Sequence, residues 1–405
     1  MTNNNLRTLR WLTYMMFLMF AMTTDAVGVI IPELMAKFDL SMTQAGMIHY
    51  GPMLAIALAG LGLGFLADRF GRKLTVMLGL GLFALVSYAF IWGDDFYYFL
   101  SLMMVSGVAI GVFKTAALAL IGDISRSTKE HTTTVNGVEA FFGVGAIIGP
   151  LIVTTLLAAG IDWKWLYFIA GNLCICLILI ASRVQYPYAK LSETKERGSF
   201  TQTLALVRNP YAFSFSVGAF LYVATESAIY VWMPTYLLGY DGSFLLLATY
   251  ALTLFFVLRA LGRFLGMWLL ERVSWSMVMM LCSGFIALCF VTSIVVGKSI
   301  AVVLLPLTGL FMSVIYPTLN SKGISCFHKN QHGSVAGVIL FFTAAGAAAG
   351  PLIMGVVSDA FGGDAVYGFI VATVFAVLLF LGLLYNWLKA PVDAHLRAMD
   401  SELDV

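Results

Sequence analysis

The stretch GFLADRFGRK, residues 64–73, decides how the rest of the chain is read, because it is a charged decamer between two long apolar segments. Its charged side chains are Asp68, Arg69, Arg72 and Lys73. A charge at the centre of a bilayer costs at least ~2.5 kcal/mol, so the decamer must lie at a membrane surface. Its basic excess favours the cytoplasmic surface. Asp68 at a helix end can pair with the arginines and lock one conformation.

The composition is that of a membrane protein rather than a soluble one. Of the 405 residues, 60% are hydrophobic and only 11% are charged, far from the average of soluble domains. The net charge of +2 identifies no partner, and nucleic acid is not indicated. The five cysteines match no disulfide framework or metal site. We therefore expect no cofactor and no structural metal.

The chain contains enough apolar sequence for twelve membrane-crossing helices, each of which needs ~20 mostly apolar residues. They begin near Trp11, Ala45, Leu74, Phe96, Thr134, Trp163, Tyr211, Ser243, Trp275, Ser299, Ser334 and Ala365. The first apolar run is too long for a signal-peptide core and should be retained. We predict an all-α polytopic membrane protein with a six-helix bundle over 1–182, a cytoplasmic linker over 183–209 and a second six-helix bundle over 210–405.

The distribution of lysine and arginine predicts the orientation of the chain in the membrane. With a cytoplasmic N-terminus, only Lys37, Lys164 and Lys298 of the 23 basic residues fall outside, and three more lie within spans. This bias puts both termini in the cytoplasm. We expect a multi-pass protein of the plasma membrane, specifically the inner membrane of a bacterium, that works as a monomer.

The two halves of the chain form a parallel repeat. The pairs Asp25 and Glu226, Gly64 and Gly266, and Pro150 and Pro351 are separated by 201, 202 and 201 residues. GVGAIIGPLI (143–152) and AAGAAAGPLI (344–353) are two Gly-x-x-x-Gly-Pro stretches in the fifth and eleventh spans. Small residues at this spacing allow close helix crossing.

The decamer resembles the signature loop of the Major Facilitator Superfamily of transporters, and the Gly-Pro stretches are similar to that family's fifth-helix motif. The resemblance implies twelve transmembrane helices in two pseudo-symmetric six-helix bundles, with a substrate site at the midplane between them. It also implies alternating access, with Asp68, Arg69 and Arg72 closing the inner side. An ordinary positively charged cytoplasmic loop is the alternative reading, and the repeat disfavours it.

Each charge inside a span is a candidate for function, because an unneeded one would be costly. Asp25 and Glu226 occupy equivalent places in the first and seventh spans, beside threonines and a serine. With Glu139 of the fifth span, they are our candidates for cation or proton coupling. Asp25 could bind a transported Na+ through oxygen ligands, or a carboxylate could exchange a proton. The alternative for each carboxylate is a structural ion pair or inter-helix strut.

The remaining intramembrane charges are basic. Lys114 of the fourth span could pair with Glu139, across one short loop, or contact the substrate. Arg259 and Arg263 are four residues apart in the eighth span. We expect both to snorkel or to brace the inner gate, so that Arg263 joins the decamer as a gating candidate.

Neutral polar groups beside aromatic rings favour a sugar substrate, because pyranose C–H faces pack on rings while hydroxyls bond to amides and carboxylates. In addition to Lys114, the predicted substrate-binding residues are Gln44, His49, Asn136, Tyr222, Trp232, Tyr236, Tyr316 and Asn320. Each aromatic residue could instead be packing or part of the interfacial belt.

Three segments resemble the fucose, galactose, glucose and mannose permease branch of the superfamily. They are YVATESAIYVWMPTYL (222–237), the start of the fifth span (136–145), and YPTLNS (316–321). The sequence departs from the branch by carrying Lys114 where a Glu followed by an Asn is common, and Glu139 where an amide is usual. The resemblance implies hexose uptake by symport, with protons as the usual coupling ion and Na+ in some relatives.

Other functions remain as alternatives. Within transporters these are a proton-coupled exporter of drugs and a carrier of an anion or another small polar solute. A membrane enzyme is disfavoured because no HExxH, GxSxG or paired catalytic His and Asp motif lies in a span. No soluble effector domain follows the twelfth span, which disfavours a non-transporting sensor.

Overall fold

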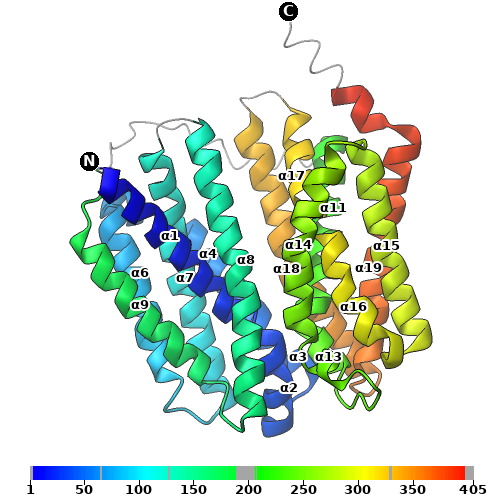
Figure 1. The fold of residues 1–405 in the computed structure, drawn as a ribbon, viewed down its shortest axis with the longest axis horizontal. Coiled ribbons are helices and arrows are strands. Elements are labelled where there is room, and N and C mark those ends of the chain that lie inside the picture. The colour runs from blue at the N-terminus through cyan, green and yellow to red at the C-terminus, as the bar shows by residue number, and fades with distance from the viewer. Residues whose placement is uncertain are drawn as a thin grey trace, which may run out of the picture. The chain divides into compact units, whose positions relative to one another are not determined.

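The computed structural model describes residues 3–63, 66–125, 128–187, 206, 208–327 and 331–396, and these residues form helices without any strand. The chain divides into two compact units, Met1–Glu193 and Thr194–Val405 (Figure 1). The predicted linker over 183–209 lies mostly outside the described residues.

Unit 1 is a bundle of long helices joined by short turns. Its elements are α1 (Asn3–Thr24), α2 (Val27–Phe38), α3 (Met42–Ala45), α4 (Met47–Leu63), α5 (Leu66–Arg69), α6 (Arg72–Ala89), α7 (Phe96–Ile124), α8 (Thr128–Ala158) and α9 (Trp165–Arg183). Helix α7 packs along α4 and α6, while α1 packs along α8.

Unit 2 repeats this plan. Its elements are α11 (Pro210–Ser227), the π-helix η1 (Ala228–Trp232), α12 (Met233–Tyr236), α13 (Leu245–Thr249), α14 (Ala251–Leu270), α15 (Trp275–Val296), α16 (Lys298–Met312), α17 (Ile315–Ser325), α18 (His332–Ala360) and α19 (Ala365–Lys389). Here α11 packs along α18 and α16 along both α14 and α15.

The predicted all-α polytopic fold is confirmed. Eleven helical segments of the described chain are long and apolar enough to cross a membrane. The one remaining predicted span, the second, which begins near Ala45, corresponds to α4, whose 17 described residues end just before the two residues at 64–65 that the structure does not describe.

The first and seventh predicted spans are interrupted at equivalent places. Helix α1 ends at Thr24, a turn follows at Asp25, and α2 begins at Val27. Helix α11 ends one residue after Glu226 and passes into η1. Pro234 contributes to the second interruption, because proline cannot donate to the carbonyl four residues earlier and its ring clashes with that group. Short π-helical segments of this kind are frequent at functional sites.

The Gly-x-x-x-Gly-Pro stretch of unit 1 brings α8 against the backbone of α1. A Cβ atom added at Gly145 would lie 2.1 Å from the carbonyl oxygen of Leu18, and one at Gly149 would lie 2.1 Å from that of Met22. No side chain fits at these distances. The sequence prediction that small residues allow a close helix crossing here is confirmed.

We expect Gly149→Ala to destabilise the protein by about 1–3 kcal/mol or more, because the added methyl group must push α1 away from α8. Gly143→Ala is the matched control on the same helix, since its Cβ would meet no atom within 4 Å. Thermal unfolding of both purified variants checks this. Equal midpoints for the two variants would contradict the close crossing.

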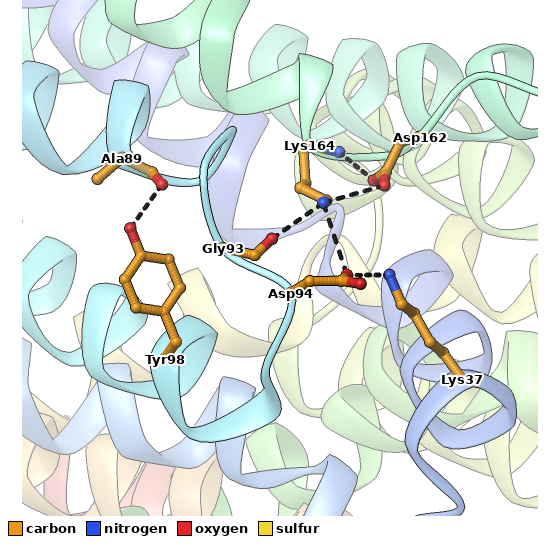
Figure 2. A network of polar contacts seen from close by, with 7 residues as sticks. All are labelled: Lys37, Ala89, Gly93, Asp94, Tyr98, Asp162 and Lys164. Atoms are coloured by element: carbon orange, nitrogen blue, oxygen red, sulfur yellow. Dashed lines mark hydrogen bonds and ion pairs between the residues drawn. The ribbon is translucent and has the colours of Figure 1, made fainter.

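A polar network ties together three chain segments at the end of unit 1 that the sequence predicts to be extracellular (Figure 2). Asp94, between α6 and α7, pairs with Lys37 near the end of α2. Lys164 Nζ lies 3.3 Å from Asp162 Oδ2 and 4.0 Å from Asp94 Oδ1, and it donates to the carbonyl oxygen of Gly93 at 3.2 Å. The hydrogen bond from Lys37, followed by its charge, lowers the pKa of Asp94 from its ordinary value of 3.8.

This network predicts a pH dependence of stability with a definite sign. Because the folded-state pKa of Asp94 is depressed, its contribution is present above pH 3.8 and is lost as the pH falls through the lower folded value. Wild type should exceed Asp94→Asn in unfolding midpoint by a constant amount well above pH 3.8, and the gap should narrow as the pH falls below 3.8. Asp241→Asn, which removes an exposed carboxylate of unit 2, is the control. A gap that persists in acid would refute the assignment.

A short helical segment after α19, residues 391–396, folds back onto unit 2, and we call it the strap. Asp393 accepts hydrogen bonds from Trp275 Nε1 at 2.6 Å and from Ser276 Oγ at 3.3 Å. The His395 ring stacks on Tyr211 with centroids 4.1 Å apart, and its Nε2 lies 2.9 Å from the carbonyl oxygen of Cys326. The strap thus joins the ends of α11, α15 and α17.

Candidate functional site

Unit 2 holds a buried ion pair between its first and second long helices. Glu226 near the end of α11 is only 6% exposed, and its Oε1 lies 2.8 Å from Arg259 Nη2 of α14. The Tyr222 hydroxyl, one helical turn before Glu226, lies 2.8 Å from the same oxygen and 2.9 Å from the carbonyl oxygen of Met312. Two helices, α11 and α14, therefore meet at one carboxylate oxygen, and the Tyr222 hydroxyl links this oxygen to the end of α16.

Two further residues extend this cluster. The charge of Arg263, one turn beyond Arg259 on α14, also acts on Tyr222. The Tyr316 ring of α17 stacks on that of Tyr222, with centroids 6.3 Å apart and planes 20° from parallel. The arrangement combines a charge pair, a phenol and stacked rings, as a small polar ligand with one apolar face requires.

The prediction that Arg259 snorkels or braces an inner gate is wrong. Its guanidinium is directed at Glu226 instead, because a carboxylate in the bundle interior needs a partner to offset the cost of its burial. Sequence reasoning treated the two residues separately, since they lie on different helices. The sequence did contain a signal for this pairing, because few other charges occur in the spans of the second half.

Unit 1 holds a second group of intramembrane charges. The half-buried Lys114 of α7 feels the charges of Glu139 on α8 and, less strongly, of Asp25 at the break between α1 and α2. Its ammonium lies 4.8 Å from the centre of the Phe20 ring and 6.0 Å from that of Phe17, as in cation–π contacts. Lys114 thus lies near enough to Glu139 for their charges to interact, as predicted. Asp25 is a further member of this group that the sequence did not pair with Lys114.

Like Tyr222, three further predicted sugar-binding residues are packed into the interiors of their units. The fully buried Trp232 donates from Nε1 to the carbonyl oxygen of Pro351 at 3.1 Å. Tyr236 donates to the Ser293 carbonyl oxygen at 3.2 Å and lies against Phe369. His49 is 2% exposed and lines a small cavity inside unit 1. In this conformation, all three support the helix packing.

The other polar residues predicted to bind the substrate lie at separate places in the structure. Gln44 is exposed and forms a capping box with Ser41 at the start of α3, outside the spanning helices. Asn136 is exposed on α8, one turn before Glu139, and therefore lies beside the charges of unit 1. Asn320 is half-buried on α17, one turn after Tyr316, beside the cluster of unit 2. The last two are accessible to a ligand.

Within the decamer, the structure gives Arg72 a partner. Its Nε lies 2.9 Å from Asp123 Oδ2 near the end of α7, a partner that sequence reasoning missed. Arg69 is exposed beside the Phe70 ring. Asp68 lies in α5, but its side chain is outside the described residues. The gating roles of Asp68, Arg69, Arg72 and Arg263 stay predictions.

Across the described residues, no group of three His, Cys, Asp or Glu side chains is arranged to hold a metal ion. The two clusters differ in formal charge. Lys114 acts with two carboxylates, Glu139 and Asp25, whereas Glu226 is paired with Arg259 and Arg263 lies one helical turn further along α14.

Comparison with known sequences finds similarity to one family of proteins and to several of its relatives. The model of the Major Facilitator Superfamily matches residues 13–351. The L-fucose-proton symporter of Escherichia coli (strain K12) is 22% identical over 404 residues, which cover 90% of each chain. Protein spinster homolog 1 of Xenopus laevis is 25% identical over 222 residues, or 52% of this chain and 42% of that protein.

Solved structures share the fold. The crystal structure of the transporter FucP in the outward conformation matches with a TM-score of 0.63 at 21% identity, covering 94% of this chain and 98% of that one. The nucleoside transporter NupG matches with a TM-score of 0.75 at 14% identity over the same shares. At these identities the likeness concerns the arrangement of helices alone.

Proposed function

This chain belongs to the Major Facilitator Superfamily, and we propose that it is a secondary transporter that imports a hexose, glucose-like or galactose-like, by symport with Na+ or H+. As a family member it is a multi-pass membrane protein that binds a small-molecule substrate. The proposal includes a location in a bacterial inner membrane, with both termini in the cytoplasm. It also includes that the protein works as a monomer and without a cofactor.

The observation that carries the proposal is the group of charges in unit 1. Asp25 and Glu139 together exceed Lys114 by one negative charge, and uptake of one cation makes the group neutral. Neutrality lowers the cost of keeping charged groups inside a membrane. Carboxylate oxygens suit Na+, and a carboxylate can also take up a proton. Cation binding thus becomes coupled to the conformation of unit 1.

The cluster of unit 2 supports a sugar as the cargo. Glu226 and Tyr222 provide hydrogen-bonding groups, and Tyr316 and Asn320 lie beside them on α17 with partial exposure. Hydroxyl groups of a pyranose pair with the polar atoms, and its C–H face packs on a ring. The similarity to an L-fucose-proton symporter along 90% of the chain supports the same class of cargo.

The test is uptake of radiolabelled glucose, with galactose and fucose as competitors, into vesicles that contain the full chain. An imposed Na+ gradient and an imposed proton gradient are applied separately. Accumulation under one gradient supports symport and names the cation, and Asp25→Asn together with Glu226→Gln should abolish it. Lack of uptake under either gradient would reject hexose import. Export of a preloaded cationic dye would then favour the exporter, and lack of all flux a sensor.

A further inference from the structure

A groove opens at the end of unit 1 where α6 begins, and we call it the α6 groove. Its volume is about 370 Å³, within the ~300–1,000 Å³ typical of ligand sites. Its lining residues are Phe70, Gly71, Arg72, Lys73, Leu74, Met77, Tyr186 and Pro187. Two of these eight residues are cationic and none is acidic. The groove is therefore suited to an anion.

Lys73 has a hydrogen-bond donor left for a ligand. Its ammonium donates to the carbonyl oxygen of Ser182 at 2.7 Å and to that of Val184 at 3.3 Å, at the end of α9. An ammonium has three donors, so one remains. Among the residues that the structure describes, no carboxylate forms an ion pair with Lys73. Its positive charge is held in place by backbone groups that do not neutralise it.

Tyr186 supplies a second donor. Its hydroxyl oxygen is buried, and it makes no hydrogen bond with any described part of the chain. Buried polar atoms without a partner are rare in folded proteins. Burial raises the pKa of Tyr186, so the hydroxyl keeps its proton and can donate. The Lys73 ammonium lies 5.9 Å from the centre of the Tyr186 ring, and both residues line the groove.

The start of α6 adds backbone donors. Gly71 is its N-cap residue, has a φ of 82° and provides no side-chain cap for the first turn. The leading N–H groups of an 18-residue helix therefore point out of its end, where they favour anions such as phosphate.

An apolar surface continues from the groove along the same helix. Leu74, Leu78, Leu82 and Leu85 are all exposed on α6, at the spacing of one helical face. Since α6 is a membrane span, this face can carry an acyl chain, and the start of the helix lies at the level of the lipid headgroups.

We propose that the α6 groove binds the phosphate of an anionic glycerophospholipid, with an acyl chain along the leucine face of α6. Lys73, Tyr186 and the first N–H groups of the helix donate to the phosphate oxygens, whereas Arg72 is already paired with Asp123. A zwitterionic lipid fits less well, because its ammonium finds no carboxylate among the lining residues. The proposal concerns lipid binding alone and does not depend on the transported substrate.

The experiment is native mass spectrometry of the purified full chain with added phosphatidylglycerol, phosphatidylcholine or sn-glycerol 3-phosphate. We expect retention of one phosphatidylglycerol, weakened at least ~10-fold by Lys73→Gln and by Tyr186→Phe, since each removes a hydrogen bond to a charged group. Arg272→Gln is the matched control, because it removes a positive charge at a helix end of unit 2. It should leave retention unchanged.

Three outcomes would overturn the proposal. Equal retention of phosphatidylcholine would remove the selectivity for anionic lipid. Equal binding of glycerol 3-phosphate would make the groove a site for soluble phosphate. Weakening by Arg272→Gln as large as that by Lys73→Gln would indicate unspecific attraction to charge. Tyr186→Phe keeps the test decisive if Lys73→Gln fails to fold, because it removes only one oxygen atom.

Discussion

Arg259→Met should destabilise the protein by about 3–5 kcal/mol and abolish uptake, because it leaves the Glu226 carboxylate buried without its guanidinium partner. The Glu226 side chain is only 7% exposed, so water compensates little for the lost guanidinium. Thermal unfolding of the purified protein and uptake into vesicles measure the two effects. The loss of stability and the loss of uptake should both be larger than the losses caused by any single substitution of an exposed charged residue.

A second substitution separates the charge from the packing of the side chain. Arg259→Met combined with Glu226→Gln removes both members of the pair, and the double variant should recover most of the lost stability. Uptake should remain absent, because the carboxylate proposed to contact the sugar is gone. Arg272→Met provides the control, since its guanidinium lies over Trp268 rather than beside a buried acid. If the double variant is less stable than Arg259→Met, the ion pair does not govern stability.

Lys114→Met should reduce gradient-driven uptake at least ~30-fold, because truncating one member of a charge group costs about 2 kcal/mol or more. Without the ammonium, Asp25 and Glu139 leave two uncompensated negative charges, and uptake of one cation no longer makes the group neutral. Gradient-driven accumulation should therefore fall, which initial rates with and without the imposed gradient will show.

Lys114→Arg tests whether charge alone is required. It keeps the positive charge and should retain dependence on the gradient at a lower rate. Lys298→Met is the control at the start of α16, where the ammonium donates to the carbonyl oxygen of Leu238 at 2.5 Å. Accumulation at the wild-type level in Lys114→Met, with normal thermal stability, would remove this charge group from the coupling mechanism.

The helices were predictable because each must satisfy all its backbone groups within itself and expose apolar side chains to lipid. Residues such as Phe96, Trp275 and Ala365 begin helices where hydropathy predicts. The interruptions after Thr24 and Ser227 were not predicted, since both occur within continuous apolar sequence. They depend on packing against other helices, which hydropathy does not contain.

The candidate site was predictable in kind but only partly in detail. Costly charges inside spans identified Asp25, Lys114, Glu139 and Glu226 without a structure. The partner of Glu226 could not be deduced, because two residues on separate helices meet only when tertiary packing fixes the register. Trp232 was predicted to bind the substrate and instead packs in the core. The sequence cannot separate these two roles, because an aromatic ring in an apolar helix has the same pattern in both.

The strap has a consequence for how the protein is made. Asp393 and His395 follow α19 in the chain, so α11, α15 and α17 are synthesised well before the segment that joins their ends. Chains emerge from the ribosome at ~5–20 residues per second and fold as they emerge. Unit 2 therefore lacks the strap's hydrogen bonds and ring stacking for several seconds after these helices have been made.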